Sequence, residues 1–353
     1  MQNSYRLNNF NKIAVIQTAF IGDVILSFPL CDAIRQLNPN CELYFVTTPE
    51  SAELAERIIP INEVLIYDKR NEHNGFSGIM KLASELKNRN IDLVLTPHRS
   101  FRSSLLSTFS GAVRKISFNR SALSFLYSKR VKYKYHDHEI FRNLNLLSVF
   151  KEFEDYEFDH DFTSYVNEEV VAVILNNGRK NILMFPGSVW ETKKWPKEHF
   201  KELINYFNDF NVYLMGSKKE FELCEWIADG TNANNLAGKL PLASAIDMIK
   251  ENADLVITND SSPTHMSFIA GKPVVTIYGP TSPEFGFYPL NGSSVHLDLE
   301  CSPCRIHGSN KCPIGTHDCM KKLSPKLLFD RINEDYPSLF EWKSEAIIGN
   351  EKG

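Results

Sequence analysis

The fold class is decided by residues 12–40, KIAVIQTAFIGDVILSFPLCDAIRQLNPN. This stretch opens with the short apolar run Ile13–Ile16, which is typical of a buried strand, and continues as an amphipathic segment from Ile21 to Leu37. We predict that the segment is a helix ending before Asn38-Pro39, because proline disfavours helical backbone in the residue before it. A buried strand followed by a helix is the unit from which parallel α/β sheets are built.

The same alternation continues along the rest of the chain, which predicts two doubly wound parallel sheets. A polar, acidic stretch, Lys151–Asp161, separates the two series. The predicted strands are Leu43–Val46, Val64–Tyr67, Leu93–Leu95, Asn181–Phe185, Val212–Met215, Leu255–Thr258 and Val274–Tyr278. The predicted helices are Ile79–Asn88, Glu220–Ala228, Leu242–Glu251 and Pro263–Ala270, with another opened by Pro196.

The chain is therefore expected to form two Rossmann-like α/β domains, in agreement with its 353 residues at ~150 residues per domain. We place the first domain at 1–160 and the second at 161–323. Residues 324–353 are predicted to form a tail, helical over Ser324–Ile348, that packs back across the domains. In such proteins ligands bind outside the carboxyl ends of the strands, so the loops after the strands are candidate sites.

The composition indicates a folded protein of the cytoplasm. Hydrophobic residues make up 43% of the chain and charged residues 23%, which excludes an intrinsically disordered protein. No run approaches the ~20 apolar residues that span a bilayer, and the N-terminal residues do not resemble a signal peptide. A cytoplasmic location argues against disulfides among the seven cysteines.

A basic stretch lies in the first half, although the net charge is −4. Residues 99–134 hold nine lysines and arginines and no acidic residue. Such runs are often solvated faces, but this length and imbalance also fit a surface that meets a polyanion or an anionic membrane. The nine residues are Arg99, Arg102, Arg114, Lys115, Arg120, Lys129, Arg130, Lys132 and Lys134.

The first candidate loop, Thr18–Val24, follows the strand Ile13–Ile16. Gly22 lets the backbone turn closely into the helix. Asp23 is then either an ordinary first-turn acid that interacts with the helix dipole or a general base that takes a proton from an acceptor hydroxyl. A GxGxxG fingerprint is absent, which disfavours NAD binding.

The second candidate loop, Phe185–Pro196, joins a strand to a helix. Gly187 and Ser188 offer backbone N–H groups and a hydroxyl, while Lys193 and Lys194 add positive charge. These groups suit a pyrophosphate better than they suit a plain surface turn. The third loop follows Val212–Met215 and holds Gly216 and Glu220. Glu220 is either a ribose ligand or a common first-turn acid.

The fourth candidate loop, Thr258–His265, concentrates polar groups between a strand and a helix. Asp260, Ser261, Ser262 and His265 surround backbone amides that can hold phosphate oxygens. Ser262-Pro263 also fits a simple helix cap with proline in the first turn, and His265 also fits a structural histidine. The turn Gly279-Pro280-Thr281 faces the same side.

Four of the seven cysteines lie within 19 residues: Cys301, Cys304, Cys312 and Cys319. Only the first pair has the two-residue gap typical of zinc ligands. A structural zinc site and reduced thiols in a surface loop are therefore both compatible with the spacing, and a disulfide is the least favoured reading.

Four stretches resemble glycosyltransferase family 9, the heptosyltransferases. They are IGDVILSFPL (21–30), FPGSVWETKKWPKEHF (185–200), TNDSSPTHMSFIAGKPVVTIYGPTSP (258–283) and CSPCRIHGSNKCPIGTHDCM (301–320), in the family's order and over nearly the whole chain. The resemblance implies a GT-B fold, in which two Rossmann-like domains face a cleft, with the acceptor on the first and the donor on the second. It also implies an inverting, metal-independent transfer of heptose from ADP-heptose to the lipopolysaccharide inner core on a lipid A precursor.

The resemblance assigns roles to individual residues. Asp23 falls on the family's proposed catalytic aspartate, Lys193 on its phosphate-binding lysine and Glu220 on the glutamate associated with the donor ribose. Ser262 departs from the family, which usually has glycine there, and this puts the donor geometry in question. The donor-binding set is Gly187, Ser188, Lys193, Gly216, Glu220, Asp260, Ser261, Ser262 and His265; the acceptor-binding set is Gly22, Arg99, Arg102 and Arg120.

The expected partners are a nucleotide-diphosphate sugar and an anionic glycolipid, with peripheral contact at the inner face of the cytoplasmic membrane and no nucleic acid. No cofactor is required beyond the ADP-sugar, apart from the structural zinc that the cysteines leave open. The alternatives are a transferase that uses another nucleotide sugar for a surface glycan, an epimerase or phosphorylase-like enzyme, and a nucleotide-sugar-binding protein on a degenerate scaffold.

Overall fold

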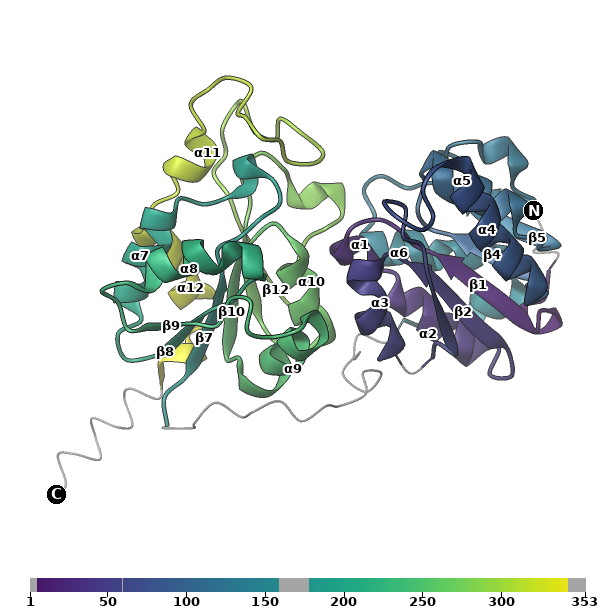
Figure 1. Ribbon diagram of the computed structural model, residues 1–353. Coiled ribbons are helices and arrows are strands. Elements are labelled where there is room, and N and C mark those ends of the chain that lie inside the picture. The colour runs from purple at the N-terminus through teal and green to yellow at the C-terminus, as the bar shows by residue number, and fades with distance from the viewer. Residues whose placement is uncertain (1–4, 59, 159–177, 342–353) are drawn as a thin grey trace. The chain divides into compact units, whose positions relative to one another are not determined.

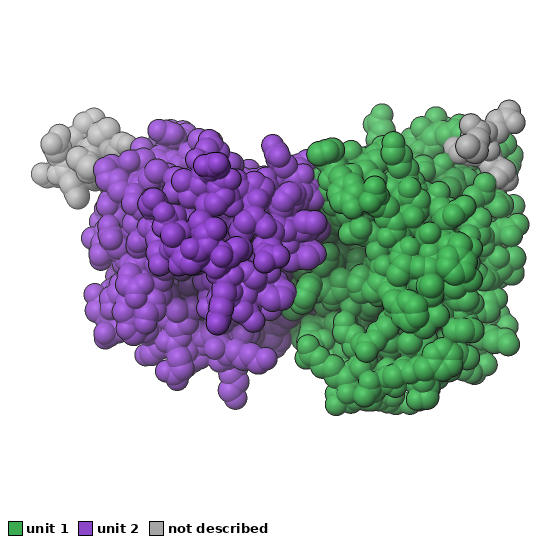
Figure 2. Space-filling model, turned by 90° about the horizontal axis from the view of Figure 1, so that it is seen from above, with its two compact units in different colours: residues 1–168 green, residues 169–353 purple. Residues whose placement is uncertain are grey.

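The computed structural model describes residues 5–58, 60–158 and 178–341. The chain divides into two compact units, Met1–Glu168 and Glu169–Gly353 (Figure 2). The predicted domain boundary between residues 160 and 161 lies outside the described residues. Across the three described ranges, no helix is both long enough and apolar enough to cross a membrane.

Unit 1 is built on a six-stranded parallel sheet with the order β3-β2-β1-β4-β5-β6 (Figure 1). The chain starts in the middle, adds β2 and β3 on one side of β1, and then crosses to β4 on the other side. The loops after β1 and β4 therefore diverge, which is where such sheets bind ligands. The strands are β1 (Lys12–Ile16), β2 (Glu42–Thr47), β3 (Glu63–Ile66), β4 (Leu93–Thr96), β5 (Arg114–Phe118) and β6 (Lys129–Val131).

The helix predicted over Ile21–Leu37 is wrong in one respect, because the structure divides it into α1 (Ile21–Ile25) and α2 (Phe28–Leu37). Pro29 lies in the first turn of α2, so it has no N–H to donate to the preceding turn. Ser27 lies in the break, and its hydroxyl donates a 2.7 Å hydrogen bond to Val24 O. The remaining helices of this unit are α3 (Pro49–Glu56), α4 (Gly75–Asn88), α5 (Phe101–Phe109) and α6 (Glu139–Leu144).

Unit 2 has the same topology, with the parallel order β12-β11-β10-β7-β8-β9. The apolar strands predicted here are confirmed, whereas the edge strands β9 and β12 were not predicted because their sequences, ANN and GSSV, are mostly polar. The strands are β7 (Asn181–Phe185), β8 (Asn211–Leu214), β9 (Ala233–Asn235), β10 (Leu255–Asn259), β11 (Val274–Ile277) and β12 (Gly292–Val295). The helices are α7 (Lys197–Tyr206), α8 (Phe221–Ala228), α9 (Leu242–Asn252), α10 (Ser262–Ile269), α11 (Asp318–Lys321) and α12 (Pro325–Asp335).

The C-terminal helix α12 completes the core of unit 2. Leu328 and Ile332 are fully buried in this core, and Phe329 stacks on Tyr206 of α7 with 4.9 Å between ring centroids. The predicted helix was longer, but α12 ends at Asp335 because Pro337 disfavours helical backbone before it. The last residues of that prediction, 342–348, lie outside the described residues.

Candidate functional site

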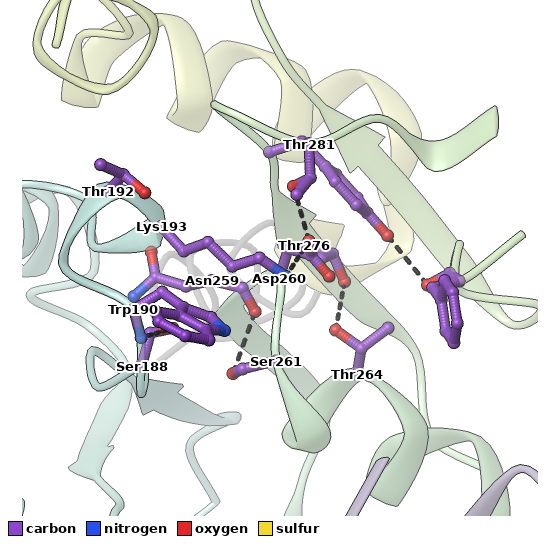
Figure 3. Close-up of polar contacts among 12 residues, drawn as sticks. Ser188, Trp190, Thr192, Lys193, Asn259, Asp260, Ser261, Thr264, Thr276 and Thr281 are labelled. Atoms are coloured by element: carbon purple, nitrogen blue, oxygen red, sulfur yellow. Dashed lines mark hydrogen bonds and ion pairs between the residues drawn. The ribbon is translucent and has the colours of Figure 1, made fainter. Parts of the chain in front are cut away.

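An ion pair joins the loops after the adjacent strands β7 and β10 of unit 2 (Figure 3). Lys193 Nζ lies 2.6 Å from Asp260 Oδ2, and the two side chains are only 14% and 10% exposed. Thr281 Oγ1, from the loop after β11, donates a 2.6 Å hydrogen bond to the same carboxylate oxygen. The structure thus brings together Lys193 and Asp260, both predicted donor ligands, and adds Thr281, which the sequence had marked only as part of a turn.

Asn259, the last residue of β10, fixes both ends of the loop after β7. Its Oδ1 accepts a hydrogen bond from the Trp195 backbone N–H at 3.0 Å, and its Nδ2 donates to Pro186 O at 2.8 Å. The Trp195 indole is buried and donates to Leu323 O at 2.8 Å. Asn259 was not predicted as a site residue, although it stands between Thr258 and Asp260 in a loop already marked as polar.

Glu220 joins the loop after β8 to the loop after β7. Its carboxylate accepts a 2.6 Å hydrogen bond from the Ser217 backbone N–H and completes a capping box at the short 3₁₀ helix η7 (Lys218–Glu220). A Cβ added at Gly187 would overlap Glu220 Oε1, and one added at Gly216 would lie 2.9 Å from Glu220 Oε2. These two predicted donor residues are therefore glycines because the Glu220 carboxylate occupies the space that a side chain would need.

The start of α10 holds the remaining predicted donor residues. Ser261, not Ser262, is the N-cap, and its hydroxyl donates to Asn259 O at 3.3 Å. Ser262 is the first helical residue, and its φ is not positive, so the backbone does not require the glycine usual in the family. His265 is buried in the helix. Ser188 lies apart from them in the β7 loop, where its hydroxyl accepts from the Trp190 backbone N–H at 3.4 Å.

In unit 1, Asp23 is half-buried in the first turn of α1, after the carboxyl end of β1, and Gly22 precedes it. Thr18 of the same loop is held at both its carbonyl and its hydroxyl. Lys69 Nζ donates to Thr18 O at 3.1 Å, and Thr18 Oγ1 lies 3.0 Å from His98 Nδ1. Lys69 follows β3 and His98 follows β4, so the rule that led to the other loops would also have found them.

His98 is a neutral histidine among cations. Burial, the largest cause, and the charges of Lys69 and Arg99 together lower the pKa of His98 to about 4. Burial and the nearby Arg102 likewise lower the pKa of Lys69. An anion bound beside these residues would relieve the repulsion among Lys69, Arg99 and Arg102.

Two of the predicted acceptor residues, Arg99 and Arg120, stack on tyrosines that contact each other. The guanidinium carbon of Arg99 lies 4.0 Å from the centroid of the Tyr133 ring, and that of Arg120 lies 5.1 Å from the Tyr135 ring. The two rings meet edge to face at 5.1 Å. Tyr133 is held in turn by Arg142, whose Nη1 donates to the tyrosine hydroxyl at 3.0 Å.

Comparison with known proteins decides the family. Residues 79–314, more than half of the chain, match glycosyltransferase family 9 (heptosyltransferase). The protein belongs to this family. It is 27% identical over 336 residues to lipooligosaccharide heptosyltransferase 2 of Campylobacter jejuni subsp. jejuni serotype O:6. The aligned region covers 92% of this chain and 98% of that protein.

Solved structures confirm the GT-B fold of this family 9 glycosyltransferase. A glycosyl transferase family 9 from Veillonella parvula DSM 2008 superposes with a TM-score of 0.75 at 21% identity, covering 94% of this chain and 99% of that one. The E. coli heptosyltransferase WaaC with ADP-2-deoxy-2-fluoro heptose superposes with a TM-score of 0.73 at 17% identity, covering 92% and 99%.

The cysteine segment of this glycosyltransferase packs against the loop after β7. Cys301, Cys304, Cys312 and Cys319 are free thiols, and the described residues contain no group of three or more His, Cys, Asp or Glu that could hold a metal ion. Instead, the Thr192 backbone N–H donates to Ser309 O at 3.0 Å, and His317 Nε2 lies 2.7 Å from Thr192 O. The segment therefore holds in place the turn that carries Lys193.

A cavity of about 410 Å³ opens beside Glu220, at the carboxyl ends of β8 and β9. Phe221 and Ala237 give it apolar surface, and Lys218 and Lys239 give it positive charge. Lys218 of η7 lines this cavity, and Glu220 of the same 3₁₀ helix reaches Gly187 in the loop after β7. The basic stretch, in contrast, is spread over both ends of the sheet of unit 1. Arg114, Lys115 and Lys129 lie at the amino ends of β5 and β6, whereas Arg99, Arg102 and Arg120 lie near the carboxyl ends of the strands.

Proposed function

We propose that the protein transfers heptose from ADP-heptose to the lipopolysaccharide inner core of a lipid A precursor, by an inverting reaction that needs no metal. The observation that carries the proposal is the buried Lys193–Asp260 pair at the carboxyl edge of unit 2. The pair supports the proposal because a diphosphate would need a cation at this edge in a sheet of this topology. The names of the relatives, a lipooligosaccharide heptosyltransferase and a heptosyltransferase with an ADP-sugar analogue, support heptose and ADP as the transferred sugar and the carrier.

The donor would be bound by unit 2 through three neighbouring features. Lys193 and the backbone amides at the start of α10 would hold the diphosphate. The Glu220 carboxylate is held by the Ser217 backbone N–H and packs against Gly187. It would accept hydrogen bonds from the ribose hydroxyls. The cavity beside Glu220, with the ring of Phe221 on its wall, would take the base. Gly216, Ser188, Ser261, Ser262 and His265 complete the proposed donor set.

The chemistry follows from one carboxylate and one ammonium group. The Asp23 carboxylate would take the proton from the acceptor hydroxyl while the oxygen of that hydroxyl forms a bond to the anomeric carbon. The bond from that carbon to the diphosphate oxygen would break on the opposite face, which inverts the configuration. The electron pair would leave with ADP, and the Lys193 ammonium would stabilise the charge that develops there, in the role that a divalent metal has in other transferases.

The acceptor would be an anionic glycolipid bound by unit 1. Arg99 and Arg120 on their tyrosine platform, with Arg102 and Gly22, would bind its phosphate or acidic sugar groups. Such an acceptor would place the protein in the cytoplasm, at the inner face of the cytoplasmic membrane.

A nucleotide panel and a transfer assay test the proposal. ADP should raise the unfolding temperature more than UDP or GDP does, and ADP-heptose should lose its sugar only when an inner-core acceptor is present. Preference for UDP or GDP would indicate another nucleotide sugar. Release of free sugar or of an epimer without an acceptor would indicate the epimerase or phosphorylase-like alternative, and binding without turnover would indicate a degenerate scaffold.

A further inference from the structure

Helix α5 buries serines beside Leu106 on its inner face and exposes phenylalanines on its outer face. Ser103, Ser104 and Ser107 face inward and are fully buried, whereas Phe101 and Phe109 are 57% and 38% exposed. Two of the inward serines have hydrogen-bond partners: Ser104 donates to Ala122 O, and Ser103 Oγ lies 3.0 Å from His98 Nδ1. These hydrogen bonds explain why the inner face carries serines. They do not explain why two large aromatic side chains lie on the outer face.

The exposed phenylalanines of α5 are part of a longer apolar surface. On α4, which packs beside α5 on the same face of the sheet (Figure 1), Phe76 and Met80 lie one turn apart and are also exposed. The rings of Phe76 and Phe109 meet edge to face at 5.9 Å, which joins the two helices at the surface. We call this surface the apolar ridge; it consists of Phe76, Met80, Phe101, Phe109, Val113 after α5, and Phe125 on the 3₁₀ helix η2 (Ser124–Leu126) that contacts α5.

Basic residues stand at both ends of the apolar ridge. Arg102 and Arg120 are exposed near Phe101 and η2. At the other end, Lys87 lies against Gly111, where an added Cβ would be 3.0 Å from Lys87 Cγ, and Lys115 Nζ donates to Ala112 O at 2.9 Å. Within the part of the chain that the structure describes, none of these four bases forms an ion pair with a carboxylate. Their charge is therefore available to a partner.

We propose that the apolar ridge docks unit 1 on an anionic phospholipid bilayer. Phenylalanine rings exposed in this way insert at the level of the lipid headgroups, and bases beside them bind the lipid phosphates. An anionic bilayer satisfies both kinds of side chain at once, which a neutral apolar partner would not. The proposal deepens the proposed function, since it names the surface by which the enzyme reaches a glycolipid, and it rests on that function only for the identity of the acceptor.

The test uses the full chain with vesicles and without any sugar substrate. The protein should sediment with vesicles of phosphatidylcholine and phosphatidylglycerol, and less with phosphatidylcholine alone. Raising the salt concentration should weaken the binding, because each base contributes an electrostatic attraction that salt screens. The double variant Phe76→Ser/Phe109→Ser should bind at least about tenfold less, since two aromatic side chains no longer leave water. Leu327→Ser, at a position 41% exposed on α12 of unit 2, is the matched control and should bind like wild type.

Three results would overturn the docking proposal: no binding to anionic vesicles, equal binding to both compositions, or equal loss of binding in the Leu327→Ser control. A dimer that the double variant abolishes, measured by sedimentation velocity, would show instead that the ridge joins two copies of the chain. Transfer to a delipidated acceptor separates this proposal from the proposed function. The double variant should keep wild-type turnover there, whereas a wild type without turnover would refute the function and leave the vesicle result intact.

Discussion

The two units share one strand order, yet the cations at their carboxyl edges have different partners. In unit 2 the cation is already paired: Lys193 lies 2.6 Å from Asp260, and both are largely buried. In unit 1 the cations have aromatic or carbonyl neighbours instead, because Arg99 and Arg120 stack on tyrosines and Lys69 donates to Thr18 O. His98 beside them is kept neutral by burial.

This difference shows that the sheet topology determines where the loops lie but not which ligand they bind. A paired, buried cation is rigid and selects a ligand that makes further contacts around it. Cations held by aromatic rings and backbone carbonyls keep their charge for whatever anion approaches. The first arrangement suits a nucleotide of fixed shape, and the second suits a phosphorylated glycolipid.

The largest expected effect is at Asp23, and it would separate chemistry from binding. Asp23→Asn should lower kcat by roughly 10²–10⁴, as expected for removal of a general base. The affinity for ADP should not change, because the proposed nucleotide site belongs to unit 2. Transfer rates and calorimetry with ADP measure the two quantities. Near-wild-type turnover would remove the role assigned to Asp23.

The next effect tests the paired cation of unit 2. Lys193→Ala should lower kcat/KM by roughly 10²–10³ and weaken ADP binding, because the diphosphate loses its ammonium partner. Lys194→Ala is the matched control, since Lys194 is one residue away and pairs with Glu191 rather than Asp260. Calorimetry with ADP compares them. Equal losses in the two variants would mean that positive charge in the loop matters and the buried pair does not.

A smaller effect is expected from the glycines around Glu220. Gly187→Ala should weaken ADP binding by about tenfold, because its Cβ would overlap Glu220 Oε1 and push the carboxylate away. Gly216→Ala should have less effect, as its Cβ would lie 2.9 Å from Oε2. Titration with ADP ranks the two variants. If both bind ADP like wild type, the Glu220 carboxylate does not contribute to the donor site.

In unit 1, the tyrosine platform can be tested through the acceptor. Tyr133→Leu removes the ring under Arg99 and should raise the acceptor KM by about threefold, in line with the strength of a cation–π contact. Tyr133→Phe keeps the ring and loses only the hydroxyl that accepts from Arg142, so its acceptor KM should stay closer to wild type. The donor KM should not change in either. A change in both KM values would point to general loss of structure.

The smallest effect is a pH dependence of stability set by His98. The pKa of His98 is about 4 in the folded protein and 6.5 in its unperturbed state, so between these values the unfolded chain binds more protons. The free energy of unfolding should therefore fall as the pH drops from 6.5 toward 4. His98→Gln should lose less stability over this range in urea titrations. Parallel pH curves for wild type and variant would contradict the neutral, buried state of His98.

Much of the fold follows from the sequence because buried parallel strands are continuous apolar runs. Ile13–Ile16 and Leu255–Thr258 are recognisable for this reason, and so are the loops that follow them. The edge strands β9 and β12 carry no such signal, because one side of an edge strand has no neighbour in the sheet and polar residues are tolerated there. The break before Pro29 was visible in the sequence, and only the proline rule was needed to find it.

The contacts of the site are harder to predict than its location. The parallel-sheet rule places Lys193 and Asp260 at one edge, but the 2.6 Å pairing depends on how two loops fold over Asn259. The glycine at 187 suggested a phosphate, and the structure shows that the nearest group is the Glu220 carboxylate. The basic stretch is spread over both ends of the sheet, because Arg114 and Lys115 begin β5 whereas Arg120 follows its carboxyl end.

The Lys193–Asp260 pair also affects how strongly inorganic phosphate would compete for the proposed donor site. An incoming anion must share Lys193 with a carboxylate only 2.6 Å away, so a free phosphate ion gains little from the exchange. A nucleotide sugar bound as proposed would offset that cost through its ribose and base, which a small ion lacks. The proposed donor site would therefore stay available to the nucleotide sugar in competition with inorganic phosphate.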